Sequence, residues 1–91
     1  MSVRVQMPPF LCTLTGSARQ MTAEGHSVAE VMTNISMQHP LIARHVFDED
    51  GHIRCGLVFL HDGVLVRAGE AAGRSVHDGD EIVMRNALSG G

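Results

Sequence analysis

Residues 57–67 have the sequence LVFLHDGVLVR, two apolar runs on either side of Asp62-Gly63. Asp-Gly favours a tight turn whose twist matches paired strands, so this segment predicts a β-hairpin. Both faces of the hairpin are apolar. One face would carry Leu57, Phe59, Val64 and Val66, and the other Val58, Leu60 and Leu65. A single helix covers one face of a sheet, so the second face is a candidate docking surface unless residues 41–56 fold over it.

The segment before the hairpin predicts the main helix, over residues 27–38. Ser27 and Glu30 have the spacing of a capping box, which satisfies two free amides at a helix start. The apolar residues that follow recur at the spacing of one helix face: Val28, Val31, Met32 and Ile35. Because the residue before a proline disfavours the helical conformation, His39-Pro40 ends this helix.

The remaining segments complete an α+β pattern. Residues 2–7 alternate as a strand, which predicts an N-terminal hairpin with a second strand at 19–23. The other predictions are a short helix at 41–47, turns at 48–51 and 78–80, a last strand at 81–85, an ambiguous segment at 10–15 and an irregular one at 70–77. The order β-β-α-(short α)-β-β-β predicts a four- or five-stranded sheet with one main helix on one face.

Composition excludes several function classes. The chain has 91 residues, 44% of them apolar, and a net charge of −3, so we expect one globular domain and no nucleic-acid partner, which would require a basic surface. The apolar runs are too short to span a membrane, and the N-terminus lacks the apolar core of a signal peptide. We therefore expect a cytoplasmic protein without a membrane partner.

Reactive side chains are present, but their spacing is not that of a site. His52 and Cys55 have an H-x-x-C spacing, with His39 and His45 upstream, but the paired spacings typical of structural zinc are missing, so we expect no metal. Cys12 is the second cysteine, and both are expected to be free thiols. The acidic residues lie mostly at predicted turns and at the helix cap, where carboxylates have structural roles.

The chain ends in residues 78–91, DGDEIVMRNALSGG. Glycine has no side chain, so a Gly-Gly end can extend into a slot too narrow for other residues and leaves its carbonyl carbon unhindered. A carboxylate is a poor acyl donor until it is converted to a mixed anhydride. A thin, reachable end is what an enzyme that activates a carboxylate needs.

This closing pattern resembles that of the ubiquitin-like sulfur carrier proteins, which include the small subunit of molybdopterin synthase and the carriers of thiamine and cysteine synthesis. The predicted hairpin and capped helix fall where that family has them, so the resemblance covers nearly the whole chain. It implies one β-grasp domain over residues 1–91 with a flexible tail at 86–91. Many members have proline where Asn86 stands, and the tail here is expected to leave the strand with less rigidity.

The resemblance also implies a site and a role, that of a carrier which is not itself an enzyme. Gly91 would be adenylated and converted to a thiocarboxylate, Gly90 would keep the tail thin, and Leu88 and Ser89 would lie at the mouth of the partner's tunnel. Phe59 and its neighbours would dock partners through the sheet face. The chain itself would bind no cofactor; ATP and Mg²⁺ would be used by the activating partner.

The implied partners are an E1-like adenylyltransferase and sulfurtransferase and a sulfur-accepting synthase. The acceptor stays open: a cysteine- or methionine-type amino acid, a thio-siderophore, molybdopterin or the thiamine thiazole. The length of residues 39–56 is similar to that in the branch of cysteine-synthesis and siderophore-associated carriers. In parts of that branch a JAMM-type metalloprotease removes residues after Gly-Gly, and the end at Gly91 would then be a mature form or one that needs no trimming.

Three alternatives remain. A ubiquitin-like modifier would join Gly91 to a lysine of its target. An interaction module would not use the tail at all, and a small enzyme would show activity on its own.

Overall fold

A computed structural model describes residues 2–16 and 18–86. Its elements, in chain order, are β1 (Ser2–Gln6), α1 (Pro9–Thr15), β2 (Gln20–Glu24), α2 (Val28–Gln38), α3 (Pro40–Val46), β3 (Leu57–His61), β4 (Val64–Arg67), the 3-10 helix η1 (Ala68–Gly73) and β5 (Glu81–Asn86). Five strands form one sheet in the order β2-β1-β5-β3-β4. β5 runs parallel to β1 and antiparallel to β3, so the sheet is mixed. The α+β prediction of a mixed sheet with one main helix is confirmed.

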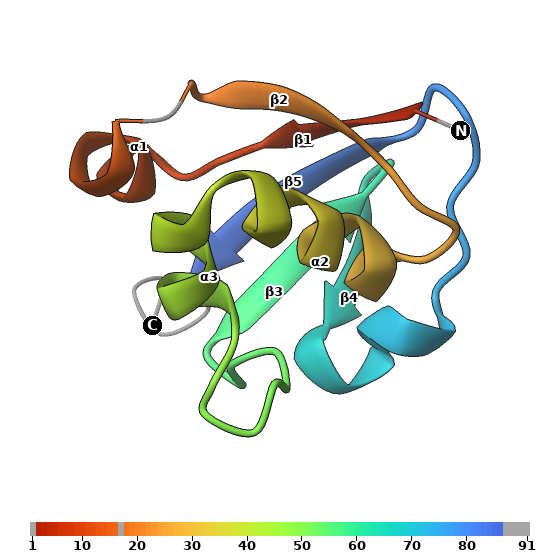
Figure 1. The fold of residues 1–91 in the computed structure, drawn as a ribbon. Coiled ribbons are helices and arrows are strands. Elements are labelled where there is room, and N and C mark those ends of the chain that lie inside the picture. The colour runs from red at the N-terminus through yellow and green to blue at the C-terminus, as the bar shows by residue number, and fades with distance from the viewer. Residues whose placement is uncertain (1, 17, 87–91) are drawn as a thin grey trace.

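The helices α2 and α3 lie on the same side of the sheet, in front of it in Figure 1. The four apolar residues predicted for one face of α2 are all buried in the core that the helix shares with the sheet. Sheet residues of that core alternate along their strands, as in Val3 and Val5 of β1 and Ile82 and Met84 of β5. Ile42 and Val46 bring α3 into the same core. The alternative in which residues 41–56 cover the second face of the sheet is therefore wrong.

The start of α2 has the cap that the sequence predicts, with one difference. The Ser27 hydroxyl accepts a hydrogen bond from the Glu30 amide at 3.1 Å. The Glu30 carboxylate accepts from the amide of His26, also at 3.1 Å, one residue earlier than a capping box requires. Two donors at the helix start are thus satisfied by side chains.

The 57–67 hairpin forms as predicted, and its turn explains the register. Asp62 and Gly63 have φ angles of 49° and 88°, the sign that a two-residue turn of this kind requires. Phe59 then pairs with Val66, and Leu60 with Leu65. Phe59 and Val66 face α2 and are buried, whereas Leu65 is 52% exposed on the opposite face.

Two elements differ from the sequence predictions. The ambiguous segment at 10–15 is α1, which begins at a proline and ends at Gly16, a left-handed residue (φ 71°) whose amide bonds the Cys12 carbonyl. The segment predicted as irregular, 70–77, overlaps η1, whose Ala71 is buried in the core. Asn86, predicted as the first tail residue, is instead the last residue of β5 and pairs with Leu57.

The hairpin register predicts opposite effects for two neighbouring side chains. Phe59→Ala leaves a cavity in the core and should lower the free energy of unfolding by about 3–5 kcal/mol. Leu65→Ala, on the other face, should cost less than about 1 kcal/mol. Urea denaturation of both variants measures this difference, and similar losses would contradict the assignment of faces.

Gly25 allows the close approach of β2 to α2. A Cβ atom at this position would lie 2.8 Å from Cγ2 of Val31 and 2.9 Å from its amide nitrogen, and the φ angle is +156°. We expect Gly25→Ala to destabilise the fold by at least about 1 kcal/mol. Gly69→Ala is the matched control, because a Cβ there meets no atom within 4 Å, and it should stay within about 0.5 kcal/mol of the parent chain. Equal thermal midpoints for the two variants would refute the close approach.

Candidate functional site

The candidate site begins where β5 ends. β5 lies between β1 and β3, and its Ile82 and Met84 side chains are buried. Its last residue, Asn86, is opposite Leu57, so the strand holds this end of the chain at a defined place in the sheet. The predicted tail residues Leu88, Ser89, Gly90 and Gly91 lie outside the described residues, and their roles stay predictions.

A side-chain network fixes the other end of β5. Asp62 and Glu81 exchange two hydrogen bonds: the Asp62 amide donates to the Glu81 carbonyl at 3.0 Å, and the Glu81 amide donates to the Asp62 carboxylate at 2.9 Å. The carboxylate of Asp78 accepts from the Ser2 amide at 2.8 Å. The carboxylates of the predicted 78–80 turn and of the hairpin turn thus join β5 to β1 and β3, which is the structural role expected of them.

His61 lies at the centre of this network and is 5% exposed. Its Nε2 is 2.7 Å from Oδ2 of Asp80, and its Nδ1 accepts a hydrogen bond from Nε of Arg74 at 2.8 Å. Because Nδ1 is an acceptor, the ring proton is on Nε2 and donates to Asp80. Oδ2 of Asp80 also accepts from the His77 amide at 2.8 Å. Two hydrogen bonds lower the pKa of Asp80 below its ordinary value. The bond from His61 has the larger effect, and the bond from the His77 amide has the smaller one.

The face of the sheet away from the helices carries an apolar patch, here called the open-face patch: Val58, Leu60, Leu65 and Val83. Val83, Leu60 and Leu65 stand opposite one another on β5, β3 and β4. Leu65 is exposed and the other three are half-buried. Phe59, expected to dock partners, is fully buried beneath α2, so this prediction is wrong. The hairpin does have an apolar face away from the helices, but the other predicted set of residues forms it: Val58, Leu60 and Leu65.

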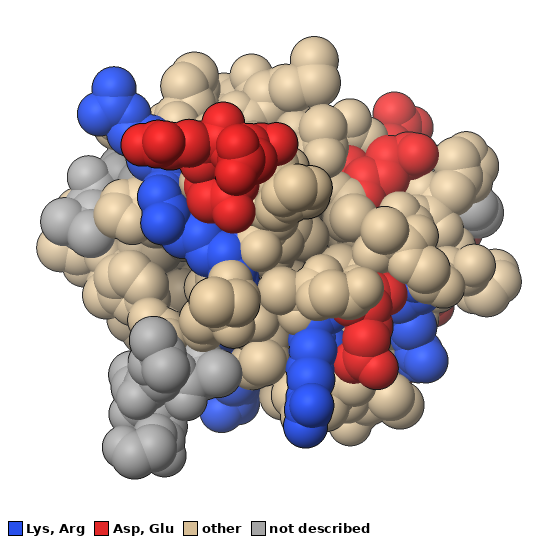
Figure 2. Space-filling model, turned by 90° about the horizontal axis from the view of Figure 1, so that it is seen from below, with Lys and Arg blue, Asp and Glu red and all other residues tan. Residues whose placement is uncertain are grey.

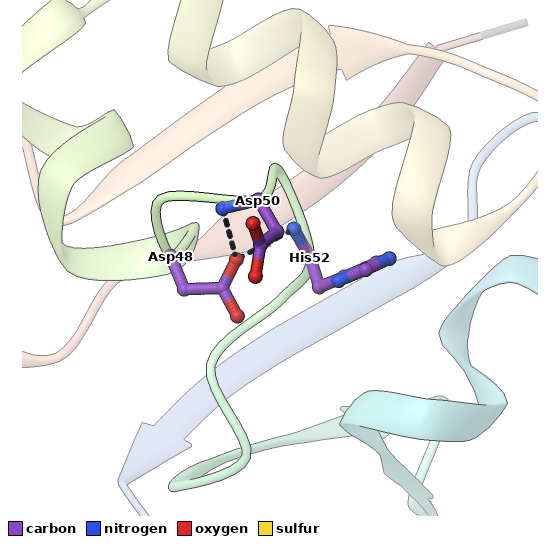
Figure 3. Close-up of side chains that lie close together, drawn as sticks. All are labelled: Asp48, Asp50 and His52. Carbon is purple, nitrogen blue, oxygen red and sulfur yellow. Dashed lines mark hydrogen bonds between the residues drawn. The ribbon is translucent and has the colours of Figure 1, made fainter.

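The loop between α3 and β3 gathers polar side chains around Asp48. Among the described residues, His52 groups with Asp48 and Asp50 (Figure 3). Oδ1 of Asp48 accepts hydrogen bonds from the amides of Asp50 and His52, at 2.9 and 3.0 Å. The bond from the His52 amide is the main cause that lowers the pKa of Asp48. These bonds account for the shape of the predicted 48–51 turn.

The two cysteines are free thiols. Cys12, on α1, is partly buried, and its Sγ lies 3.6 Å from the Ala18 carbonyl oxygen. Cys55 is exposed in the loop before β3. No helix in the described part of the chain is both long enough and apolar enough to cross a bilayer.

Comparison with solved structures connects this geometry to known proteins. SAMP1 of Haloferax volcanii matches with a TM-score of 0.83 and 23% identity, over 100% of both chains. A chain of the BexX/CysO complex of Amycolatopsis orientalis matches at 0.80 with 26% identity, over 98% of this chain and 99% of that one. CysO of Mycobacterium tuberculosis matches at 0.78 with 21% identity, over 93% and 98%.

The chain has the β-grasp fold of the ubiquitin-like sulfur carrier and modifier proteins. The neighbours include CysO and SAMP1, which confirms the resemblance that the sequence suggests. No protein-family model and no curated protein matches the sequence.

The lowered pKa of Asp80 predicts a pH dependence of stability. A carboxyl group with a lowered pKa in the folded state stabilises the fold above its unfolded value, near 3.8, and this contribution is lost as the pH falls through the lower, folded value. We expect Asp80→Asn to lower the free energy of unfolding at pH 7 and to flatten its decline below pH 4. Urea denaturation between pH 2 and 7 measures both effects.

Asp50→Asn is the control for this experiment, because Asp50 is an exposed acid of the 48–51 turn. For this variant, the free energy of unfolding should decline below pH 4 as it does for the parent chain. If the free energy of unfolding falls equally with pH in the parent and in Asp80→Asn, then Asp80 is not the cause of the loss of stability in acid.

Proposed function

We propose that this chain is a sulfur carrier that works through a thiocarboxylate at Gly91. The observation that carries the proposal is a β-grasp sheet whose central strand, β5, leads directly into the sequence Ala-Leu-Ser-Gly-Gly. The likeness to carriers and modifiers extends over nearly the whole length of each chain, which supports a shared way of presenting the C-terminus.

The chemistry follows from what a carboxylate can do. An E1-like partner would use ATP and Mg²⁺ to join the Gly91 carboxylate to AMP, with release of pyrophosphate. Hydrosulfide would then attack the carbonyl carbon and displace AMP, leaving a thiocarboxylate. The carrier contributes a rigid strand, a thin tail and an unhindered carbonyl, and the partners contribute the catalytic groups. The chain itself would bind neither ATP nor Mg²⁺.

Protein partners are part of the proposal. One neighbour was solved as a complex of two named proteins, BexX and CysO. For this chain we infer an E1-like activating enzyme and a sulfur-accepting synthase, with a JAMM-type metalloprotease where a precursor extends past Gly91. The open-face patch is a candidate contact for such partners, because it combines exposed apolar area with a position on β3, β4 and β5. The proposed setting is the cytoplasm.

A second candidate function is protein modification. It is favoured by SAMP1, which is named a small archaeal modifier protein. A modifier would use the same adenylate, but a target lysine amine would displace AMP and form an isopeptide bond. The two functions share the tail and the first reaction, and they differ in the nucleophile of the second.

The test is the intact mass of the protein after incubation with an adenylating enzyme of its own cell, ATP and a sulfide source. We expect a gain equal to the replacement of one oxygen by sulfur, located at Gly91. Deletion of Gly90 and Gly91 is the control and should abolish the gain. An unchanged mass, with an enzyme shown to activate another carrier, would overturn the carrier proposal, and a tail-dependent adduct on lysines of other proteins would favour the modifier.

A further inference from the structure

The helix α1 places an exposed aromatic side chain beside the end of β5. Phe10 is 45% exposed, whereas Phe59 is buried and Phe47 is half-buried. Two surface clefts, of about 460 and 650 Å³, meet here, and both are lined by Phe10 and by Asn86. Phe10 therefore lies beside Asn86, the last residue of β5.

Arginines surround the same point. Arg19 and Arg85 line the first cleft, and Arg44 and Arg54 line the second. These are four of the seven arginines in a chain that has no lysine and a net charge of −3. They come from separate segments: the loop before β2, β5, α3 and the loop before β3. Figure 2 shows basic side chains at the upper left, next to an acidic patch, and further basic side chains along the lower edge of the molecule.

Three other ionisable groups line the second cleft: His45, Asp48 and the exposed thiol of Cys55. His45 is half-buried, and Asp48 is exposed. The Asp48 carboxylate already accepts two backbone hydrogen bonds, so its charge is partly balanced by amide dipoles. The end of β5 is thus mostly basic in an acidic chain.

The number of residues between Asn86 and Gly91 limits the distance between Asn86 and a partner's active site that acts on Gly91. Five residues follow Asn86, and five fully extended residues span at most about 18 Å. An active site that acts on Gly91 from within a tunnel must bring the tunnel mouth close to Asn86. The side chains around Asn86 are then the ones that meet the rim of the tunnel.

We propose that Phe10, Arg19, Arg44, Arg54 and Arg85 form a tail-exit surface that binds the enzyme which activates Gly91. The partner that fits this surface is a protein with an acidic rim around its tunnel mouth and an apolar socket for Phe10. Burial of one aromatic anchor would supply most of the local affinity. The arginines would speed the encounter through charge complementarity, and this effect weakens with added salt. This inference rests on the proposed function.

The test measures the rate of thiocarboxylate formation by intact mass, as a function of carrier concentration, at low and high salt. We expect Phe10→Ala to raise KM about tenfold with little change in kcat, because an anchor contributes to binding rather than to the reaction. The double variant Arg19→Gln/Arg44→Gln should raise KM at low salt and reduce the dependence of kcat/KM on salt. Arg54 is left intact because its Nε donates to the Arg44 carbonyl at 3.1 Å.

Matched controls come from α2. Met37→Ala removes an apolar side chain that is 76% exposed, and Gln38→Glu changes the net charge by −1, as each arginine substitution does. Both should keep the KM and the salt dependence of the parent chain. Thermal midpoints identify any variant that fails to fold. If Phe10→Ala unfolds, the arginine variant, which replaces two exposed side chains, decides the question.

The outcomes separate the two proposals. Parental KM values for Phe10→Ala and the arginine variant, with activity still abolished by deletion of Gly90 and Gly91, would overturn the tail-exit surface and leave the carrier function standing. Failure of the parent chain to react with a competent enzyme would overturn both.

Discussion

The pairing of β5 with β1 and β3 holds the molecule together. Each of the other strands has a neighbour from its own hairpin, β1 with β2 and β3 with β4, and in the described sheet β5 is the strand that joins the two hairpins. β5 supplies Ile82 and Met84 to the core and hydrogen bonds to both sides. Its first end is fixed by the carboxylates of Asp62, Asp78 and Asp80. The same strand leads into the diglycine sequence on which the proposed carrier function rests, so the stability of the sheet and the proposed function depend on one element.

Periodicity predicts most of this fold because most of its elements have one apolar side. The capped stripe of α2 and the alternation of β1 are of this kind, and both form as expected. The 57–67 hairpin is different, because both of its faces are apolar. The face that is buried contains His61, a polar side chain of a type that is seldom fully buried. Its partners Asp80 and Arg74 are 19 and 13 residues away, so the local sequence holds no sign that this histidine can be buried.

The candidate site was predictable only in part, for a related reason. The Gly-Gly end is a local signal and is visible in the sequence. The surface around Asn86 is assembled from α1, α3, β5 and two loops, and proximity of this kind depends on the tertiary fold. Pro9 and Gly16 are the signals that could have revealed α1, since proline favours the first turn of a helix and glycine its C-terminal cap. Without α1, nothing places Phe10 beside the end of β5.

The position of β5 also bears on synthesis of the protein. Among the described strands, the one that joins the two hairpins is translated last, and parallel pairing of β1 with β5 connects residues more than 70 positions apart. A nascent or truncated polypeptide without β5 would display two hairpins with unpaired edges, the kind of species that aggregates or is degraded. A molecule that has folded stably is then one whose synthesis has reached the strand that leads into the diglycine, as the proposed carrier function would require.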